Sequence, residues 1–107
     1  MARGQRETPS IPSLSAKEAE VLESLGDSEK FGLQIVDESG GSIARGTIYV
    51  TLGRMEEKGF VTSRPDPSST GMPGIPRRLY RATPSGVAAL RGRAAMALAL
   101  IGRKVTR

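Results

Sequence analysis

The chain has 107 residues, a formal net charge of +5, and neither cysteine nor histidine. This length suits one domain with a single modest core. The missing side chains exclude disulfides, zinc-finger ligation and catalysis by a thiolate or an imidazole. The adjacent carboxylates at 37–38 and 56–57 point about 100° apart on a helix, so neither pair forms a catalytic dyad. We therefore expect no enzymatic activity, no cofactor and no metal ion.

The charge is unevenly distributed along the chain. All 11 acidic residues lie at or before Asp66, whereas the last 41 residues carry eight lysines or arginines and no acid. Such a cationic segment suits a phosphate backbone or an anionic membrane surface; a basic face that only maintains solubility is the alternative. No run approaches the roughly 18 consecutive apolar residues of a membrane span, and no apolar signal core follows the start. We expect a soluble, cytoplasmic protein.

The first predicted helix follows a short polar segment. Residues 1–12 combine charges and prolines without periodicity, which predicts a flexible tail. Ser15 and Glu18 have the spacing of a capping box, in which each side chain accepts a hydrogen bond from the other residue's backbone. The helix that begins there is expected to end near Leu25, before Gly26.

Two further helices are predicted in the middle of the chain. Apolar residues between 31 and 36, followed by two glycines, favour a short helix that begins near Lys30, with a strand as the alternative. A longer helix is expected over 43–58, because three apolar side chains fall on one face and Gly59 occupies the usual terminating position. These three are Ile48, Leu52 and Met55.

A hairpin and a long helix complete the chain. A strand is predicted over 60–63, a proline- and glycine-rich loop over 64–76, and a second strand over 77–82. A threonine cap followed by proline opens a final helix over 84–104. Apolar side chains along it repeat at intervals of three and four residues, as in a coiled coil, and would pack on a second copy or on the first helix. They are Val87, Leu90, Ala94, Ala97 and Ile101.

The order of these elements predicts the fold class. It is α+β, mainly α: a winged helix-turn-helix with an appended C-terminal dimerisation helix. The expected organisation is a tail over 1–12, a winged-helix DNA-binding domain over 13–83 and a dimerisation helix over 84–107. Because only 4% of the residues are aromatic, the core of one copy is thin. We therefore expect the apolar seam of the last helix to be buried in a homodimer.

The helix over 43–58 is the predicted reading element. The N-terminal part of the second helix of such a motif enters the major groove of double-stranded DNA. Thr47 and Val50 are placed to meet base edges or a thymine methyl, and Tyr49 and Arg54 lie closer to phosphates. The ring of Tyr49 has an alternative role, as a half-buried cover over the helix junction. Arg45 completes the candidate contacts on this helix.

Three arginines give the predicted hairpin a basic edge. Alternation along a strand puts Arg77 and Arg81 on one face and Arg78 on the other, so at least one of them points outward. A wing beside a docked helix commonly contacts the sugar-phosphate backbone or the minor groove. A solvated edge strand that is protected by its charges is the alternative.

Two runs of residues are similar to a known family. The first begins with GTIY at 46–49 and ends with KGFV at 58–61, and the second is GIPRRLYRATPSG at 74–86. Together they resemble the PadR family of transcriptional regulators over roughly 14–90. Ala44 and Val50 depart from the family pattern, which often has a polar helix cap and a proline at these positions.

The resemblance implies a winged-helix repressor that dimerises through C-terminal helical structure and binds a pseudo-palindromic operator. It implies DNA contacts by Thr47 and Tyr49 and a basic wing at Arg77 and Arg78, in the shorter subfamily with a single final helix. We expect a sequence-specific regulator of transcription, with an unidentified small-molecule effector as one way to control it. The main alternative is a winged-helix protein-interaction module without specific DNA binding; a further one is membrane anchoring by the last helix.

Overall fold

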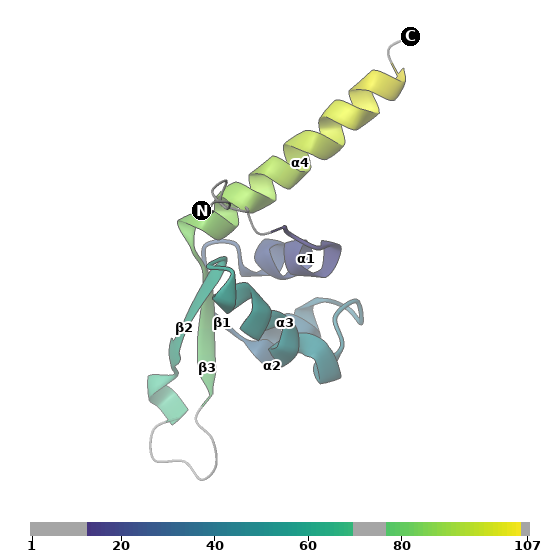
Figure 1. Ribbon diagram of the computed structural model, residues 1–107. Helices are drawn as coiled ribbons and strands as arrows, with labels where there is room; N and C mark the ends of the chain where they lie inside the picture. The colour runs from purple at the N-terminus through teal and green to yellow at the C-terminus, as the bar shows by residue number, and fades with distance from the viewer. Residues whose placement is uncertain (1–12, 70–76, 106–107) are drawn as a thin grey trace, which may run out of the picture.

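Residues 13–69 and 77–105 are described by a computed structural model, in which they form four α-helices and a three-stranded antiparallel sheet. The predicted tail at 1–12 and the loop residues 70–76 lie outside the described residues. The elements are α1 (Ala16–Leu25), β1 (Lys30–Phe31), α2 (Gly32–Glu38), α3 (Arg45–Glu57), β2 (Val61–Pro65), β3 (Arg78–Ala82) and α4 (Pro84–Val105) (Figure 1).

The start of α1 is the capping box that the sequence predicts. The side-chain oxygen of Ser15 accepts from the backbone N–H of Glu18 at 3.1 Å, and Glu18 Oε1 accepts from the backbone N–H of Ser15 at 2.9 Å. The helix ends at Leu25, as expected. Both carboxylate oxygens of the buried Glu18 also accept from Lys58 Nζ at 2.9 Å. This one side chain therefore joins the start of α1 to the end of α3.

The predicted reading helix, α3, ends as the sequence indicates. Gly59 has a φ of +83°, in the left-handed region that glycine adopts without strain. Its N–H donates to the carbonyl of Glu56 at 3.1 Å, and the N–H of Phe60 donates to the carbonyl of Met55 at 2.9 Å. These two bonds are the Schellman termination of a helix. They turn the chain toward β2, with the Phe60 ring in the core.

The segment around Lys30 differs from the prediction of a helix. Lys30 and Phe31 form the short strand β1, which pairs with Tyr80 and Leu79 of β3, and α2 begins only at Gly32. A strand of two residues has no alternation that a sequence could display. It exists because β3, far along the chain, offers it unpaired backbone groups.

The wing, which comprises β2, β3 and the segment between them, also extends further than expected. β2 continues through Arg64 to Pro65, where a loop was predicted, and pairs with β3 as far as Arg78. The strand order is β1-β3-β2, so β2 is an edge strand. Proline is tolerated there because its missing N–H faces no neighbouring strand. A short 3-10 turn follows at Pro67–Ser69.

One core holds the helices and strands together. The predicted apolar face of α3 is fully buried, and it meets the buried side chains of α1, the middle of α2, and the roots of β2 and β3. We refer to this part of the chain, before Pro84, as the head. The core side chains are Val21, Leu22, Leu25, Ile35, Ile43, Ile48, Leu52, Met55, Phe60, Val61 and Tyr80.

The beginning of α4 packs on the head, and Arg93 still donates a hydrogen bond to the carbonyl of Leu14 at 3.3 Å. Gly86 is buried so closely that a side-chain carbon there would lie 2.1 Å from the carbonyl oxygen of Phe60. Leu90 packs on the core from outside. Every residue over 91–102 is exposed, and α4 extends away from the head in the direction opposite to the 3-10 turn at Pro67–Ser69 (Figure 1). We call residues 91–102 the projecting segment.

Candidate nucleic-acid interface

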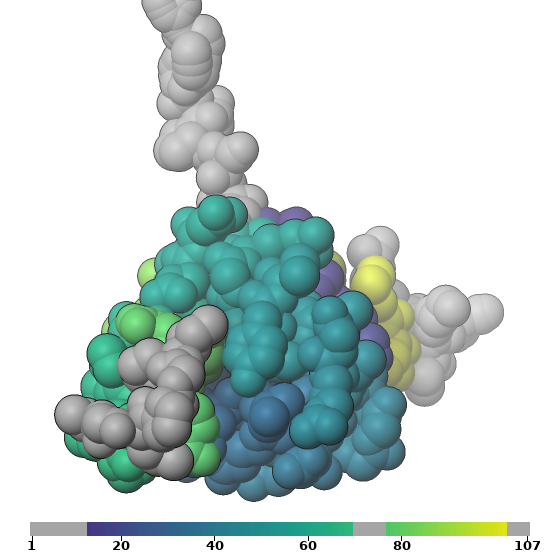
Figure 2. All heavy atoms as spheres, turned by 90° about the horizontal axis from the view of Figure 1, so that it is seen from below, coloured from purple at the N-terminus to yellow at the C-terminus, as the bar shows by residue number. Residues whose placement is uncertain are grey.

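One side of α3 is exposed, as the sequence predicts. Ile48, Leu52 and Met55 have no exposed surface, whereas the five predicted DNA contacts of this helix all face solvent. Figure 2, which views the molecule from below, shows α2 in blue, α3 in teal and the strands in green sharing one face. A single surface therefore presents the reading helix beside the wing. The five contacts are Arg45, Thr47, Tyr49, Val50 and Arg54.

The first turn of α3 has a weak cap. Ala44 is the N-cap residue and makes no side-chain hydrogen bond to the helix. The hydroxyl of Thr47 instead donates to the carbonyl of Ala44 at 3.3 Å. This bond uses the hydroxyl proton of Thr47, so its oxygen remains an acceptor on an exposed side chain. The departure at Ala44 noted in the sequence thus leaves the start of the reading helix held by backbone and Thr47 alone.

The ring of Tyr49 covers the helix junction, which is one of the two roles that its sequence position allowed. It is 53% exposed, but its free end also lies against the first residue of α2, where a side-chain carbon on Gly32 would be 2.6 Å from the ring. Tyr49 therefore covers the junction between α2 and α3 and still presents a surface to solvent. Contact with DNA remains a prediction for this residue.

The predicted wing arginines have different surroundings. Arg78 is exposed, and its Nε donates to Ser63 Oγ on β2 at 3.0 Å. Arg77 lies just before β3, where its guanidinium stacks over the Phe31 ring at 4.4 Å from the centroid and pairs with Asp66 at 3.4 Å. Part of the charge of Arg77 is therefore balanced within the protein.

Arg81 is exposed on β3, and the neighbouring strand carries a further arginine that the sequence analysis did not select. Arg64 makes a two-pronged ion pair with Glu29, with both N–O distances 2.7 Å. Hydrogen bonding to Arg64 lowers the pKa of Glu29, and Arg81 contributes from further away. Arg64 therefore ties the wing to the loop before β1.

Asp66 organises the beginning of the wing tip. Its carboxylate accepts from the hydroxyl of Ser68 at 2.7 Å and from the Ser68 backbone N–H at 3.0 Å. The Ser68 hydroxyl is the main reason that the pKa of Asp66 is lowered, and Arg77 adds to the shift. An ionised Asp66 thus stabilises the 3-10 turn and holds Arg77 beside the end of β2 that lies away from the core.

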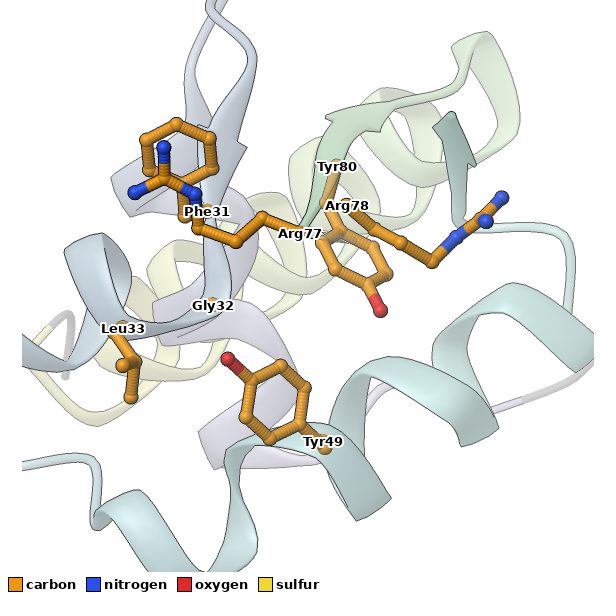
Figure 3. A pocket seen from close by; sticks show the side chains of 7 residues that line it. All are labelled: Phe31, Gly32, Leu33, Tyr49, Arg77, Arg78 and Tyr80. Carbon is orange, nitrogen blue, oxygen red and sulfur yellow. The ribbon is translucent and has the colours of Figure 1, made fainter. Parts of the chain in front are cut away.

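Two hollows flank α3. A pocket of about 440 Å³ separates Tyr49 from the root of the wing, and its walls include Phe31, Leu33 and Tyr80 (Figure 3). On the other side a hollow of about 450 Å³ lies between α3 and the first turn of α1, lined in part by Thr47, Val50 and Arg54. Phe31, Gly32 and Leu33 were not predicted as site residues, because the short β1 that places them leaves no periodic signal.

The acidic side chains in the described part of the chain do not cluster into a metal site. Over 13–69 and 77–105, no three acidic side chains gather in a way that could hold a metal ion. The predicted acidic pairs are engaged separately: Glu38 binds Lys30, and Glu56 accepts from Ser63.

The exposed reading helix and the adjacent three-stranded sheet define a winged helix-turn-helix protein. A model of the Transcriptional regulator PadR-like family matches residues 21–92. The chain belongs to this family, which consists of transcriptional regulators and not of enzymes. The resemblance found in the sequence is thereby confirmed, together with the expected fold class.

Relatives with known sequences or structures agree. The chain is 37% identical over 73 residues to the Transcriptional regulator Rv3488 of Mycobacterium tuberculosis, a match that spans 65% of this chain and 64% of the relative. It thus covers less than two thirds of that protein. A PadR family regulator from Eggerthella lenta superimposes with a TM-score of 0.65 at 26% identity, covering 82% of this chain and 80% of that one.

A third relative is Bacillus subtilis PadR, whose structure was solved in complex with operator DNA. It superimposes with a TM-score of 0.64 at 23% identity, over 75% of this chain and 48% of that chain. At this identity the likeness shows that the two proteins share a fold.

Proposed function

We propose that the protein is a cytoplasmic, homodimeric repressor that binds a pseudo-palindromic operator in double-stranded DNA. The observation that carries this proposal is the exposed side of α3 beside the wing, where Tyr49 lines the same pocket as the exposed Arg77 and Arg78 (Figure 3). Bacillus subtilis PadR, which shares this fold, was solved in complex with operator DNA, and this supports operator binding by the present chain.

In the proposed complex α3 enters the major groove. Thr47 and Val50 meet base edges, because they lie on the exposed side of the N-terminal half of the helix. Arg54, one to two turns later, meets a phosphate. Arg78 contacts the neighbouring backbone from the wing, where arginine pairs well with phosphate oxygens. Arg81 lies on the other face of β3, near Glu29.

The partner proposed for the projecting segment is a second copy of the chain. Ala94, Ala97 and Ile101 continue the predicted seam and are exposed in one copy. The apolar surface is wider than that seam, because three larger side chains around it are also exposed: Met96 at 62%, Leu98 at 69% and Leu100 at 52%. A contiguous exposed apolar surface of this kind indicates a site of interaction with another macromolecule or a membrane.

A bilayer is a poorer cover than a second copy. By length and composition the stretch Pro84–Gly102 could cross a membrane, although Arg91 and Arg93 interrupt its apolar run. However, Gly86 and Leu90 are already packed on the head. The 12 residues over 91–102 extend roughly 18 Å as a helix, which is well short of the roughly 30 Å hydrocarbon core.

The resulting dimer carries two reading helices. Half-sites about 34 Å apart, one turn of DNA, are the expected spacing for helix-turn-helix dimers. Repression follows by steric exclusion of other proteins from the operator. An effector that binds one arrangement of the two heads better than another would shift the dimer toward that arrangement and so control repression.

A salt-dependent titration against a pool of genomic fragments tests the proposal. Retained fragments are sequenced, and the wild type is compared with Thr47→Ala and Arg78→Ala. Release of counterions predicts a steep loss of affinity with salt, and removal of one phosphate contact lowers the slope by about one. We expect Arg78→Ala to weaken all sequences alike and Thr47→Ala to relax the preference among sequences.

Arg91→Ala is the matched control, because it removes the same charge from an exposed position on α4, away from the proposed interface. The repressor is supported by enrichment of a palindromic site that survives Arg91→Ala, loses its preference in Thr47→Ala, and is bound more weakly and with a lower salt slope by Arg78→Ala. No enrichment, or binding that is insensitive to Thr47→Ala and Arg78→Ala, would favour a protein-interaction module instead.

A further inference from the structure

The ring of Tyr49 lies against the backbone of Gly32 at the start of α2. A side-chain carbon built on Gly32 would lie 2.6 Å from Cε1, 2.9 Å from Cζ and 3.1 Å from the hydroxyl oxygen of Tyr49. Distances this short leave no room for any side chain at position 32 while the ring stays in place. The ring therefore rests on the bare backbone at the start of α2.

Only glycine at position 32 permits this arrangement, but the backbone does not otherwise need glycine there. The φ of Gly32 is not positive, so alanine would fit the helical backbone without strain. The atoms in the way belong to the free end of a side chain that is 53% exposed. Replacement of Gly32 by alanine would therefore displace the ring of Tyr49 and leave the fold of the head intact.

The position of this ring shapes the proposed interface. Figure 3 shows the ring of Tyr49 below Gly32, with its hydroxyl directed toward α2, and the two wing arginines on the far side of the pocket. Arg77 turns toward Phe31, whereas Arg78 extends in the other direction. The ring is thus one wall of the pocket between the reading helix and the wing, where a DNA backbone would pass.

We propose that Gly32 is a positioning residue for DNA binding: by lacking a side chain it lets Tyr49 lie across α2, in the orientation that contacts the DNA backbone. Gly32 is itself buried and makes no contact with DNA in this proposal. The inference rests on the proposed function, because Gly32 affects DNA affinity only if Tyr49 itself contacts the DNA.

A double-mutant cycle tests this inference on the full-length protein. Affinity for the enriched operator fragment is measured for the wild type, Gly32→Ala, Tyr49→Ala and the double variant. We expect Gly32→Ala to weaken binding about tenfold or more, the loss expected for one hydrogen bond to a charged group. In the Tyr49→Ala background the same substitution should have no further effect, because residues that act as a unit are not additive.

Gly92→Ala is the matched control. It makes the same exchange in α4, where no atom lies within 4 Å of the added carbon, and it should leave operator affinity unchanged. Thermal unfolding of Gly32→Ala should occur at or above the wild-type temperature, since alanine suits a helix better than glycine. The sequence has only two tyrosines, so the displaced ring of Tyr49 is readily followed by its NMR signals.

The outcomes separate the two proposals. If the wild type binds the operator and the effects of Gly32→Ala and Tyr49→Ala add, or if Gly32→Ala binds like the wild type, the positioning role is wrong and the repressor proposal stands. If the wild type binds no DNA at all, the proposed function fails and this inference fails with it.

Discussion

The head and the projecting segment contain similar apolar side chains in opposite environments. On α3, Leu52 has no exposed surface, whereas on α4 Leu98 is 69% exposed and Ile101 is 58% exposed. Both helices present their apolar residues at intervals of three and four. On α3 the other helices and the sheet cover that face, whereas on α4 it begins on the head and then runs beyond it.

The two regions differ in whether a single copy of the chain can bury their apolar surfaces. The head closes its own core with side chains that all precede Pro84, while the apolar side chains of the projecting segment stay exposed in one copy. Stability of the head is therefore expected to depend on packing within one copy, and that of the projecting segment on association. The following changes test this division, from the largest expected effect to the smallest.

Leu52→Ala should destabilise the head most. It removes a fully buried side chain from the centre of the core, and leaves a cavity that costs about 2–5 kcal/mol of the free energy of unfolding. Denaturant titration measures the loss. Leu98→Ala provides the comparison, measured in the Ile101→Glu background so that the chain is monomeric. It should change the free energy of unfolding by less than about 0.5 kcal/mol, and an equal loss would break the distinction between the two regions.

Ile101→Glu should separate the two copies. The substitution places a carboxylate in the C-terminal part of the proposed seam, and an unpaired buried charge costs several kcal/mol. Association should weaken about a hundredfold or more, as measured by sedimentation equilibrium. Ala99→Glu adds the same charge on the opposite side of the helix and should preserve the dimer. If Ile101→Glu associates like the wild type, α4 does not dimerise through this seam.

Glu18→Gln tests the link between α1 and α3 inside the head. Burial alone would raise the pKa of Glu18, but the backbone N–H of Ser15 and the ammonium of Lys58 outweigh it, so the pKa lies below its usual value of 4.5. The ionised form therefore stabilises the fold above pH 4.5, and this contribution is lost as the pH falls through the lowered pKa.

At pH 7 the substitution should cost about 1–3 kcal/mol, as expected when a buried, charge-assisted network loses its anion. Unfolding curves between pH 7 and pH 3 should show a flatter acid limb for Glu18→Gln than for the wild type. The same slope in both proteins would contradict the assigned pKa direction.

Arg64→Ala should have the smallest effect. Arg64 and Glu29 form a well-aligned ion pair, but both lie at the surface, where water and salt screen the interaction. We expect the melting temperature to stay within experimental error at physiological salt. A decrease as large as that of Glu18→Gln would mean that the wing depends on this pair for its place beside α3.

Local signals in the sequence predicted the elements that depend on neighbours in the chain. The capping box at Ser15, the termination of α3 at Gly59 and the apolar face around Leu52 each involve residues within a few turns. Local hydrogen bonding and helical periodicity determine such features. For the same reason the exposed side of α3, and with it the candidate DNA contacts, followed from knowing its buried side.

Contacts between distant segments were decided by the tertiary structure alone. β1 exists only because β3 pairs with it, and the extension of β2 to Pro65 depends on its place at the sheet edge. The contact of the Tyr49 ring with Gly32 likewise joins α3 to α2, and no local pattern in the sequence encodes how these two helices pack. The seam of α4 was visible in the sequence, but where it leaves the head was not. That point depends on where the core ends, which is a property of the packed molecule.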